Sequence, residues 1–144
     1  MRRVNDQFLV GVTGIFFNDK NQVLLVKHSY RKKGRWSLLG GYLKAGEHPK
    51  EGLEREVLEE TGYKVKANSI IGYYDIQVAF GIAFSGSLVD ETQADYFKDE
   101  IRNVLWLTSE EILKVKLRPA VKEILQDYIN GKSFSLDSIT NVSL

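Results

Sequence analysis

The segment at residues 41–63, GYLKAGEHPKEGLEREVLEETGY, constrains the fold more than any other stretch of the chain. Pro49 is typical of the first turn of a helix, and Gly62 is typical of the residue that ends one. The segment therefore predicts a helix at about 49–61. Five glutamates lie within this helix, although the formal net charge of the whole chain is only +1.

The glutamates are not spread evenly around the predicted helix. Successive residues turn by about 100°, so Glu56, Glu59 and Glu60 share an arc of roughly 100°. Leu53 and Val57 lie beside this arc and are suited to pack inward. The three carboxylates therefore border the buried face of the helix instead of lying opposite it.

Carboxylates in this position need compensating positive charge. Like charges three or four residues apart repel by about 0.2–0.5 kcal/mol per pair on an exposed helix, and desolvation near a core adds to that cost. Arg55, four residues before Glu59, neutralises only part of the set. A divalent cation would compensate the rest, and oxygen ligands without histidine or cysteine favour Mg²⁺ or Mn²⁺. The alternative is a solvated acidic helix face, which is the commoner role of a charge run.

The composition is that of a single domain over residues 1–144. Hydrophobic residues make up 43% of the chain, and the net charge of +1 points to neither nucleic acid nor a membrane. The chain has no cysteine, which excludes disulfides, thiolate zinc sites and a cysteine nucleophile. No apolar stretch is long enough to span a bilayer and the N-terminus lacks a signal-peptide pattern, so we expect a cytoplasmic protein.

Strand and helix patterns alternate along the chain and predict an α/β or α+β fold with a mixed sheet. The expected strands are 8–17 and 22–27, joined as a hairpin, then 65–74, 76–89 and 101–107. Besides the helix at 49–61, we expect a short helix over 109–115 and a final helix over 119–130. Thr108 and Glu111 have the spacing of a capping box for the short helix.

The glutamate segment resembles a known motif, the Nudix box. That box reads Gly, five residues, Glu, seven residues, Arg-Glu-hydrophobic-any-Glu-Glu-any-Gly-hydrophobic. Its positions here are Gly41, Glu47, Arg55, Glu56, Val57, Glu59, Glu60, Gly62 and Tyr63. Two departures remove no chemical group: Tyr63 replaces the usual aliphatic residue, and Leu39 stands where the family often has proline. The order of strands around the box is also similar to that of the Nudix domain.

The resemblance implies a Nudix fold, with a mixed sheet sandwiched between helices, and a hydrolase that cleaves a diphosphate linked to another group. In such an enzyme Glu56 and Glu60 would be the principal ligands of Mg²⁺ or Mn²⁺, with Glu59 also on the metal or positioning water. Arg55 would orient the glutamates by salt bridging. Glu47 would support the entry loop through Arg55 or belong to an outer metal shell.

Two further groups would come from outside the helix. The carbonyl of Gly40 would add a metal ligand, since the glycines let the backbone approach closely. The acidic loop at 90–100 would supply the general base, and Glu100 is favoured because it directly precedes the strand at 101–107, where the family often has an extra acid that also reaches the metal. A box glutamate is the alternative base, and a solvated loop is the alternative role of these acids.

A basic cluster, Arg31, Lys32, Lys33 and Arg35, stands before Trp36. It could draw in a polyphosphate or the 5′ end of an RNA, and Arg35 is the best candidate for substrate binding. The alternative is a solvated loop. Trp36 could stack on a base, although a tryptophan at the start of a strand more often belongs to the core.

Three functions are compatible with these residues. The first is hydrolysis of a nucleoside triphosphate or another nucleoside diphosphate derivative, favoured because the chain most resembles the group that cleaves nucleoside triphosphates. The second is removal of pyrophosphate from RNA 5′ ends. The third is a non-catalytic nucleotide sensor with a Nudix fold, although such proteins commonly lose box glutamates that are present here.

The polar tail at 131–144 has two compatible arrangements, since Phe134 and Leu136 alternate with serines. It could add an edge strand or cross to a second protomer in a homodimer, or it could dock on its own domain.

Overall fold

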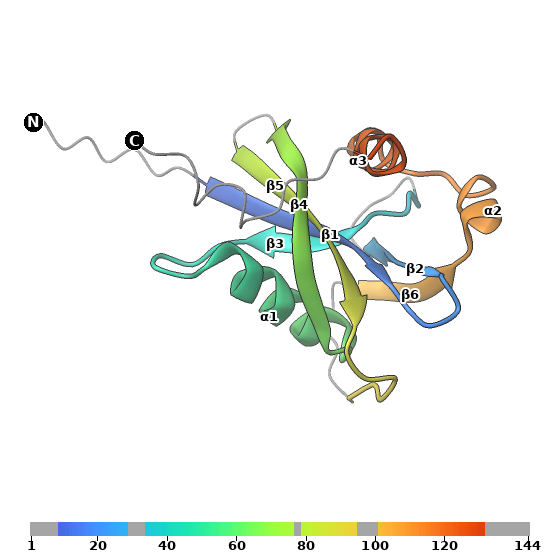
Figure 1. Ribbon diagram of the computed structural model, residues 1–144, viewed down its shortest axis with the longest axis horizontal. Coiled ribbons are helices and arrows are strands. Elements are labelled where there is room, and N and C mark those ends of the chain that lie inside the picture. Colours follow the sequence, from blue (N-terminus) through green and yellow to red (C-terminus); the bar gives the residue numbers. More distant parts are fainter. Residues whose placement is uncertain (1–8, 29–33, 77–78, 95–100, 132–144) are drawn as a thin grey trace, which may run out of the picture.

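The structure is a computed structural model that describes residues 9–28, 34–76, 79–94 and 101–131. In these residues the order of elements is β1 (Leu9–Phe17), β2 (Val23–His28), β3 (Leu39–Tyr42), α1 (Pro49–Thr61), β4 (Val65–Ile76), β5 (Ala79–Leu88), β6 (Ile101–Leu107), α2 (Ser109–Ile112) and α3 (Pro119–Ile129). Figure 1 shows the sheet between α1 on one side and α3 on the other. The expected α+β fold, a mixed sheet between helices, is confirmed.

β1 lies in the middle of the sheet and organises it. It runs parallel to β5 along its whole length, from Leu9 opposite Ala79 to Phe17 opposite Ser87. β4 lies antiparallel to β5, and β6 lies antiparallel to β2, so the main path is β4-β5-β1-β2-β6. The parallel pair at the centre makes the sheet mixed.

The predicted hairpin between β1 and β2 is present only beside its turn. In the described residues the two strands pair at Phe17 and Val23. Farther along, residues 39–42 of β3 pair with residues 11–14 of β1, while β2 bridges to Ser37. The segment that leads to the predicted helix therefore lies between the two strands of the hairpin and places β3 at the centre of the molecule.

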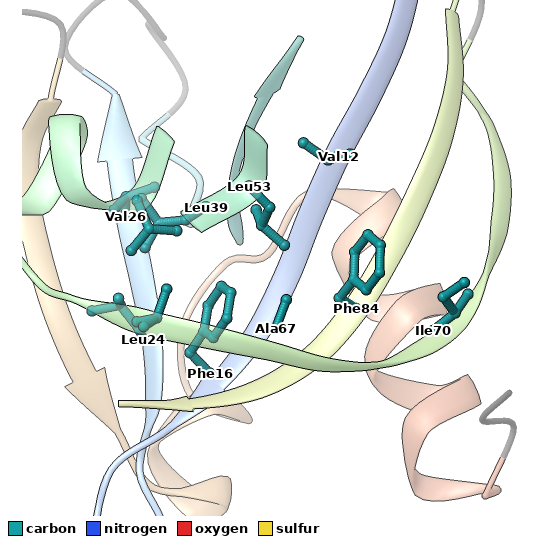
Figure 2. Packing of buried hydrophobic residues seen from close by; sticks show 11 residues of the cluster. Val12, Phe16, Leu24, Val26, Leu39, Leu53, Ala67, Ile70 and Phe84 are labelled. Carbon is teal, nitrogen blue, oxygen red and sulfur yellow. The ribbon is translucent and has the colours of Figure 1, made fainter. Parts of the chain in front are cut away.

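The two faces of the sheet carry separate hydrophobic layers because neighbouring residues of a strand point to opposite sides. Val12 and Phe16 of β1 lie in the layer on the α1 side, which Figure 2 shows together with Leu53 of α1. Ile15 lies in the other layer, on the α3 side. The helices complete the two layers with Leu53 and Val57 from α1, and with Val121 and Ile124 from α3.

Most element boundaries agree with the sequence-based prediction. The helix at 49–61 is α1, and Thr108 and Glu111 form the expected capping box of α2. β3 was not among the expected strands, and some boundaries were wrong. α2 ends at Ile112 instead of residue 115, and the strand expected from residue 76 begins at Ala79, because Ile76 belongs to β4 and pairs with Ala79. The expected strands were separated at Asp75, a residue type common in turns, but Asp75 pairs with Phe80 and the ladder continues to Ile76. The tail at 132–144 lies outside the described residues.

We predict that Tyr74→Phe destabilises the fold and that Tyr73→Phe does not. The Tyr74 hydroxyl donates a 2.6 Å hydrogen bond to Asp127 Oδ2, which ties β4 to α3. Burial raises the pKa of Tyr74, and the bond to Asp127 raises it further. Loss of a buried hydrogen bond to a charged acceptor should cost about 1–2 kcal/mol in urea unfolding.

Tyr73→Phe is the matched control, because the Tyr73 ring is 54% exposed on the opposite face and stacks on Phe80. Equal unfolding free energies for the two variants would contradict the role assigned to the bond between Tyr74 and Asp127.

Candidate active site on helix α1

The ends of α1 are set by its flanking residues. His48 is the N-cap residue in an extended conformation, and Pro49 follows at the first helical position. At the other end Gly62 has a φ of 75°, and a Cβ there would come within 2.0 Å of the carbonyl oxygen of Ala94. Glycine is therefore required at this position both by the backbone angle and by the close approach of a second segment.

That second segment is the start of the acidic loop after β5. The Ala94 N–H donates to the Gly62 carbonyl at 2.9 Å, and the Gln93 side chain donates to the Thr61 carbonyl at 2.7 Å. These contacts hold residues 93–94 at the C-terminal end of α1. Sequence reasoning missed Gln93 and Ala94, because both are far from α1 in sequence and have no distinctive local pattern.

The five glutamates of α1 have different surroundings. Glu56 and Glu60 are buried, with 8% and 5% exposure, beside the fully buried core residues that α1 contributes. Glu54 instead accepts the backbone N–H of Ala67 at 3.1 Å and so ties α1 to β4. Glu51 is exposed in the first turn, where a negative charge is favourable at the positive end of the helix. The expected position of the carboxylates, at the border of the buried face, is therefore present.

Arg55 connects three glutamates through one guanidinium group. Its Nε and Nη2 donate to the two carboxylate oxygens of Glu47 at 2.6 and 3.0 Å. Its Nη1 donates to Glu56 at 3.0 Å and to Glu59 at 3.1 Å. The entry loop before α1 is thereby tied to Glu56 and Glu59, which lie about two and three turns along the helix.

These contacts change the electrostatics of the site. The hydrogen bonds from Arg55 and from the Lys44 backbone lower the pKa of Glu47 from 4.5 to about 2. The bond to Glu47 raises the pKa of Arg55 further above its already high value, so the guanidinium stays protonated. Arg55 brings one positive charge to three carboxylates, which leaves an excess of negative charge on this side of α1.

Gly41 of β3 brings the backbone against this cluster. A Cβ on Gly41 would lie 2.5 Å from the carboxyl carbon of Glu56, so any side chain at this position would displace the Glu56 carboxylate. The Glu56 carboxylate therefore lies directly on the β3 backbone. Gly40 lies in the same strand opposite Thr13, and its role as a carbonyl ligand stays a prediction.

The donor set fits a hard divalent cation. Glu56, Glu59 and Glu60 offer only oxygen atoms, and two of these side chains are buried where unbalanced negative charge is costly. Among the residues that the structure describes, no group of three or more His, Cys, Asp or Glu side chains is placed so that it could hold a metal ion by itself. Any ion held here would therefore need further oxygen atoms, which suits Mg²⁺, since it usually keeps several waters.

The predicted base lies outside the described residues. Glu100 belongs to the segment 95–100, so its position stays a prediction, although β6 begins directly after it at Ile101. Of the other acids in this loop, Asp90 accepts the N–H of Thr92 at 2.9 Å, which lowers the pKa of Asp90 and indicates a turn-forming role.

Arg35 lies away from Arg55 and its glutamates, in a pocket beside α3. Lys116 and Lys122 line the same pocket, and sequence reasoning missed both because they come from a distant part of the chain. Residues 31–33 of the predicted basic cluster lie outside the described part of the chain. Trp36 is half-buried and packs on the layer beneath α3, which favours the structural role considered for it.

The two departures from the box motif are accommodated by packing. Tyr63 meets Trp106 edge-on, with ring centroids 5.4 Å apart. Leu39 is completely buried beneath α1, and its carbonyl accepts the Thr13 hydroxyl at 2.7 Å.

The family model described as the NUDIX domain matches residues 7–128. A putative 8-oxo-dGTP diphosphatase from Bacillus subtilis is 31% identical over 124 residues, which cover 84% of this chain and 80% of that protein. A MutT-like protein from Streptomyces ambofaciens is 29% identical over 103 residues, covering 72% of this chain and 66% of the relative.

A third similar protein, the NAD-capped RNA hydrolase NudC from Photobacterium profundum, is 29% identical over 115 residues, and the match covers 75% of this chain but 41% of NudC. The chain thus spans about two thirds of the MutT-like protein and less than half of NudC. Among solved structures, a NUDIX hydrolase from Nitrosomonas europaea superposes with a TM-score of 0.77 at 26% identity, covering 91% of this chain and 95% of that one. In the part of the chain that is described, we find no helix with the length and apolar character needed to cross a membrane.

We predict that Glu47→Gln removes a pH-dependent part of the stability. Folding lowers the pKa of Glu47 from 4.5 to about 2, so its contribution is present above pH 4.5 and is lost as the pH falls through about 2. The wild type should exceed the variant in urea midpoint near neutral pH, and the gap should close on acidification.

Glu51→Gln removes the same charge from an exposed position without a hydrogen-bonded arginine and serves as the control. A gap between wild type and Glu47→Gln that stays constant between about pH 5 and pH 2 would exclude this ion pair as its source.

Proposed function

The chain belongs to the family of Nudix hydrolases, and we propose that it hydrolyses a diphosphate bond in a nucleoside triphosphate or another nucleoside diphosphate derivative. The observation that carries the proposal is the set of carboxylates gathered on α1 around Arg55, with Glu56 in contact with the β3 backbone. In this proposal the phosphoanhydride lies beside these carboxylates and is attacked there by water. The negative charge of the phosphoanhydride itself hinders that attack.

In the proposed reaction a water oxygen attacks phosphorus and forms a new P–O bond. The bond from that phosphorus to the bridging oxygen breaks, and the bridging oxygen leaves with the other phosphate group. One proton of the water passes to a carboxylate base. A divalent ion, Mg²⁺ or Mn²⁺, would neutralise the charge of the diphosphate and acidify the water when bound.

The residues of α1 have distinct roles in this proposal. Glu56 and Glu60 are the principal ligands of the ion, and Glu59 contributes to the same ion or positions the water. Arg55 keeps Glu56 and Glu59 in place and ties them to Glu47, as the short contacts of its guanidinium indicate. Fixed positions matter because displacements of about 1 Å in catalytic groups can cost on the order of 100-fold in rate.

We assign the general base to Glu100, with the Gly40 carbonyl as a further ligand. Two observations support the assignment of Glu100. Gln93 and Ala94 hold the preceding part of its loop against the end of α1, and β6 begins at Ile101. A glutamate of the box is the alternative base.

A nucleoside triphosphate is the favoured substrate. One relative that matches this chain over most of the length of both proteins is named a putative 8-oxo-dGTP diphosphatase. The NudC relatives match over smaller shares of their own length, between 26% and 41%. This difference in coverage supports a nucleoside triphosphate as the substrate.

Hydrolysis at an RNA 5′ end is the second candidate. The repeated similarity to NAD-capped RNA hydrolases favours it, although it covers only part of those proteins. A competition experiment with single-stranded 5′-triphosphorylated RNA distinguishes the two candidates. If the free nucleotide is the substrate, the RNA should inhibit cleavage of the nucleoside triphosphate only weakly. If RNA is the substrate, the RNA should be cleaved faster than the nucleoside triphosphate.

We predict that Glu60→Gln abolishes metal-dependent cleavage while leaving the fold intact. Removal of a carboxylate that holds the ion or a proton should lower kcat/KM by at least about 100-fold. The assay measures phosphate and pyrophosphate release from nucleoside triphosphates, nucleotide sugars, ADP-ribose and dinucleoside polyphosphates, with Mg²⁺ or Mn²⁺.

Glu51→Gln makes the same chemical change on the exposed first turn of α1 and should retain activity. If the wild type cleaves none of these compounds or triphosphorylated RNA, the hydrolase proposal fails and a nucleotide sensor takes its place. If the two variants are equally active, the assignment of Glu60 fails.

A further inference from the structure

A second concave site lies on the α3 side of the sheet. It is a pocket of about 540 Å³ lined by Arg35, Lys116, Leu117, Pro119 and Lys122. None of these residues belongs to α1 or to the carboxylate cluster around Arg55. Because α3 covers the face of the sheet opposite α1 (Figure 1), different elements build the two sites.

Backbone hydrogen bonds hold the walls of this pocket together. The Trp36 N–H donates to the Lys116 carbonyl at 2.8 Å, and the Arg118 N–H donates to the Trp36 carbonyl at 3.1 Å. Trp36 and Leu117 also pack on the hydrophobic layer beneath α3. The segment that carries Arg35 is thereby joined to the segment that carries Lys116, so the two cations face one pocket for a structural reason.

Among the described residues, the lining carries three positive charges and no carboxylate. Arg35, Lys116 and Lys122 form no ion pair with any residue that the structure describes. Arg55, in contrast, forms ion pairs with three glutamates. The first turn of α3, where the pocket is bounded by Pro119 and Lys122, also contains no acidic residue. The formal charge of the whole chain is only +1. The three cations of the pocket are therefore a local concentration of positive charge and not the result of a generally basic chain.

We propose that this pocket binds a phosphate-type anion through Arg35, Lys116 and Lys122 without a metal ion. The planar guanidinium group of arginine matches two oxygens of a phosphate, and the lysines add compact point charges. Leu117 and Pro119 add apolar surface to the lining. The volume lies in the range of small-molecule sites and accommodates inorganic phosphate, diphosphate or the phosphate groups of a nucleotide.

The chemistry of this site is opposite to that of the α1 site. At α1 an anion meets carboxylates and can approach only when cations intervene. In the α3 pocket the cations are the side chains themselves, so binding persists when divalent ions are removed. Arg35 was the sequence-based candidate for substrate binding, whereas Lys116 and Lys122, which the test changes, have no role in the proposed hydrolysis.

The test is titration of the wild type and of Glu60→Gln with inorganic phosphate and with diphosphate, in EDTA and at constant ionic strength. NMR of the indole N–H groups reports occupancy, because Trp36 lies against the pocket wall while Trp106 packs on the α1 side. Trp106→Phe identifies the Trp36 signal. We expect a saturable shift of Trp36 in both proteins.

Variants of the lining identify the site. Lys116→Gln and Lys122→Gln should each weaken binding by roughly fivefold to tenfold, as expected for loss of one charged hydrogen bond. Lys114→Gln, an exposed neighbour outside the pocket, should not change it. Titration with a nucleoside monophosphate as a third ligand shows whether the pocket is a site for a nucleotide or for a free anion. Tighter binding of the nucleoside monophosphate than of inorganic phosphate identifies a nucleotide site. Equal binding of the two identifies a site for the free anion.

Three results would overturn the proposal. They are the absence of a saturable shift at Trp36, equal binding by the lining variants and the wild type, and binding that requires Mg²⁺ and is lost in Glu60→Gln. The last result places the anion at α1 and leaves the hydrolase proposal standing. If the wild type binds the anion in the α3 pocket but hydrolyses no substrate, the hydrolase proposal fails and the proposal of the α3 anion site stands.

Discussion

The ion-pair cluster of Arg55 is the interaction on which the candidate active site depends. One guanidinium group joins the entry loop, through Glu47, to Glu56 and Glu59 on successive turns of α1. Without it, like charges that repel one another would be held at the edge of a hydrophobic core. The arginine does not balance them fully, and the remaining negative charge is what suits this face of α1 to a divalent ion and a polyphosphate.

The sheet is built so that this cluster meets the backbone of β3. β1 and β2 diverge beyond their turn, and residues 36–42 lie between them. This places Gly41 beneath Glu56, where a side chain would displace the Glu56 carboxylate. The same segment carries Arg35 and Trp36 to the α3 side. The segment that lies between β1 and β2 therefore forms the backbone beneath the carboxylate cluster and also one wall of the basic pocket.

The element types and the identity of the box residues could be read from the local sequence, because both depend on spacing along the chain. The ends of α1, the capping box of α2 and the border position of Glu56 and Glu60 agree with that reading. Strand pairing could not be read in the same way. The extent of the hairpin and the register of β4 and β5 depend on which strands pair with one another, and a local residue pattern does not record that choice.

By itself the sequence determined which chemical groups are available: three glutamates on one arc of a helix, an arginine beside them, and glycines at both ends. Helical periodicity is enough to establish this, since it acts over a few residues. Only the tertiary structure decided what those groups meet. The docking of Gln93 and Ala94 on the end of α1, and the meeting of Arg35 with Lys116 and Lys122, join residues far apart in sequence. Such contacts follow from packing of the two hydrophobic layers on the sheet, which is a property of the whole chain.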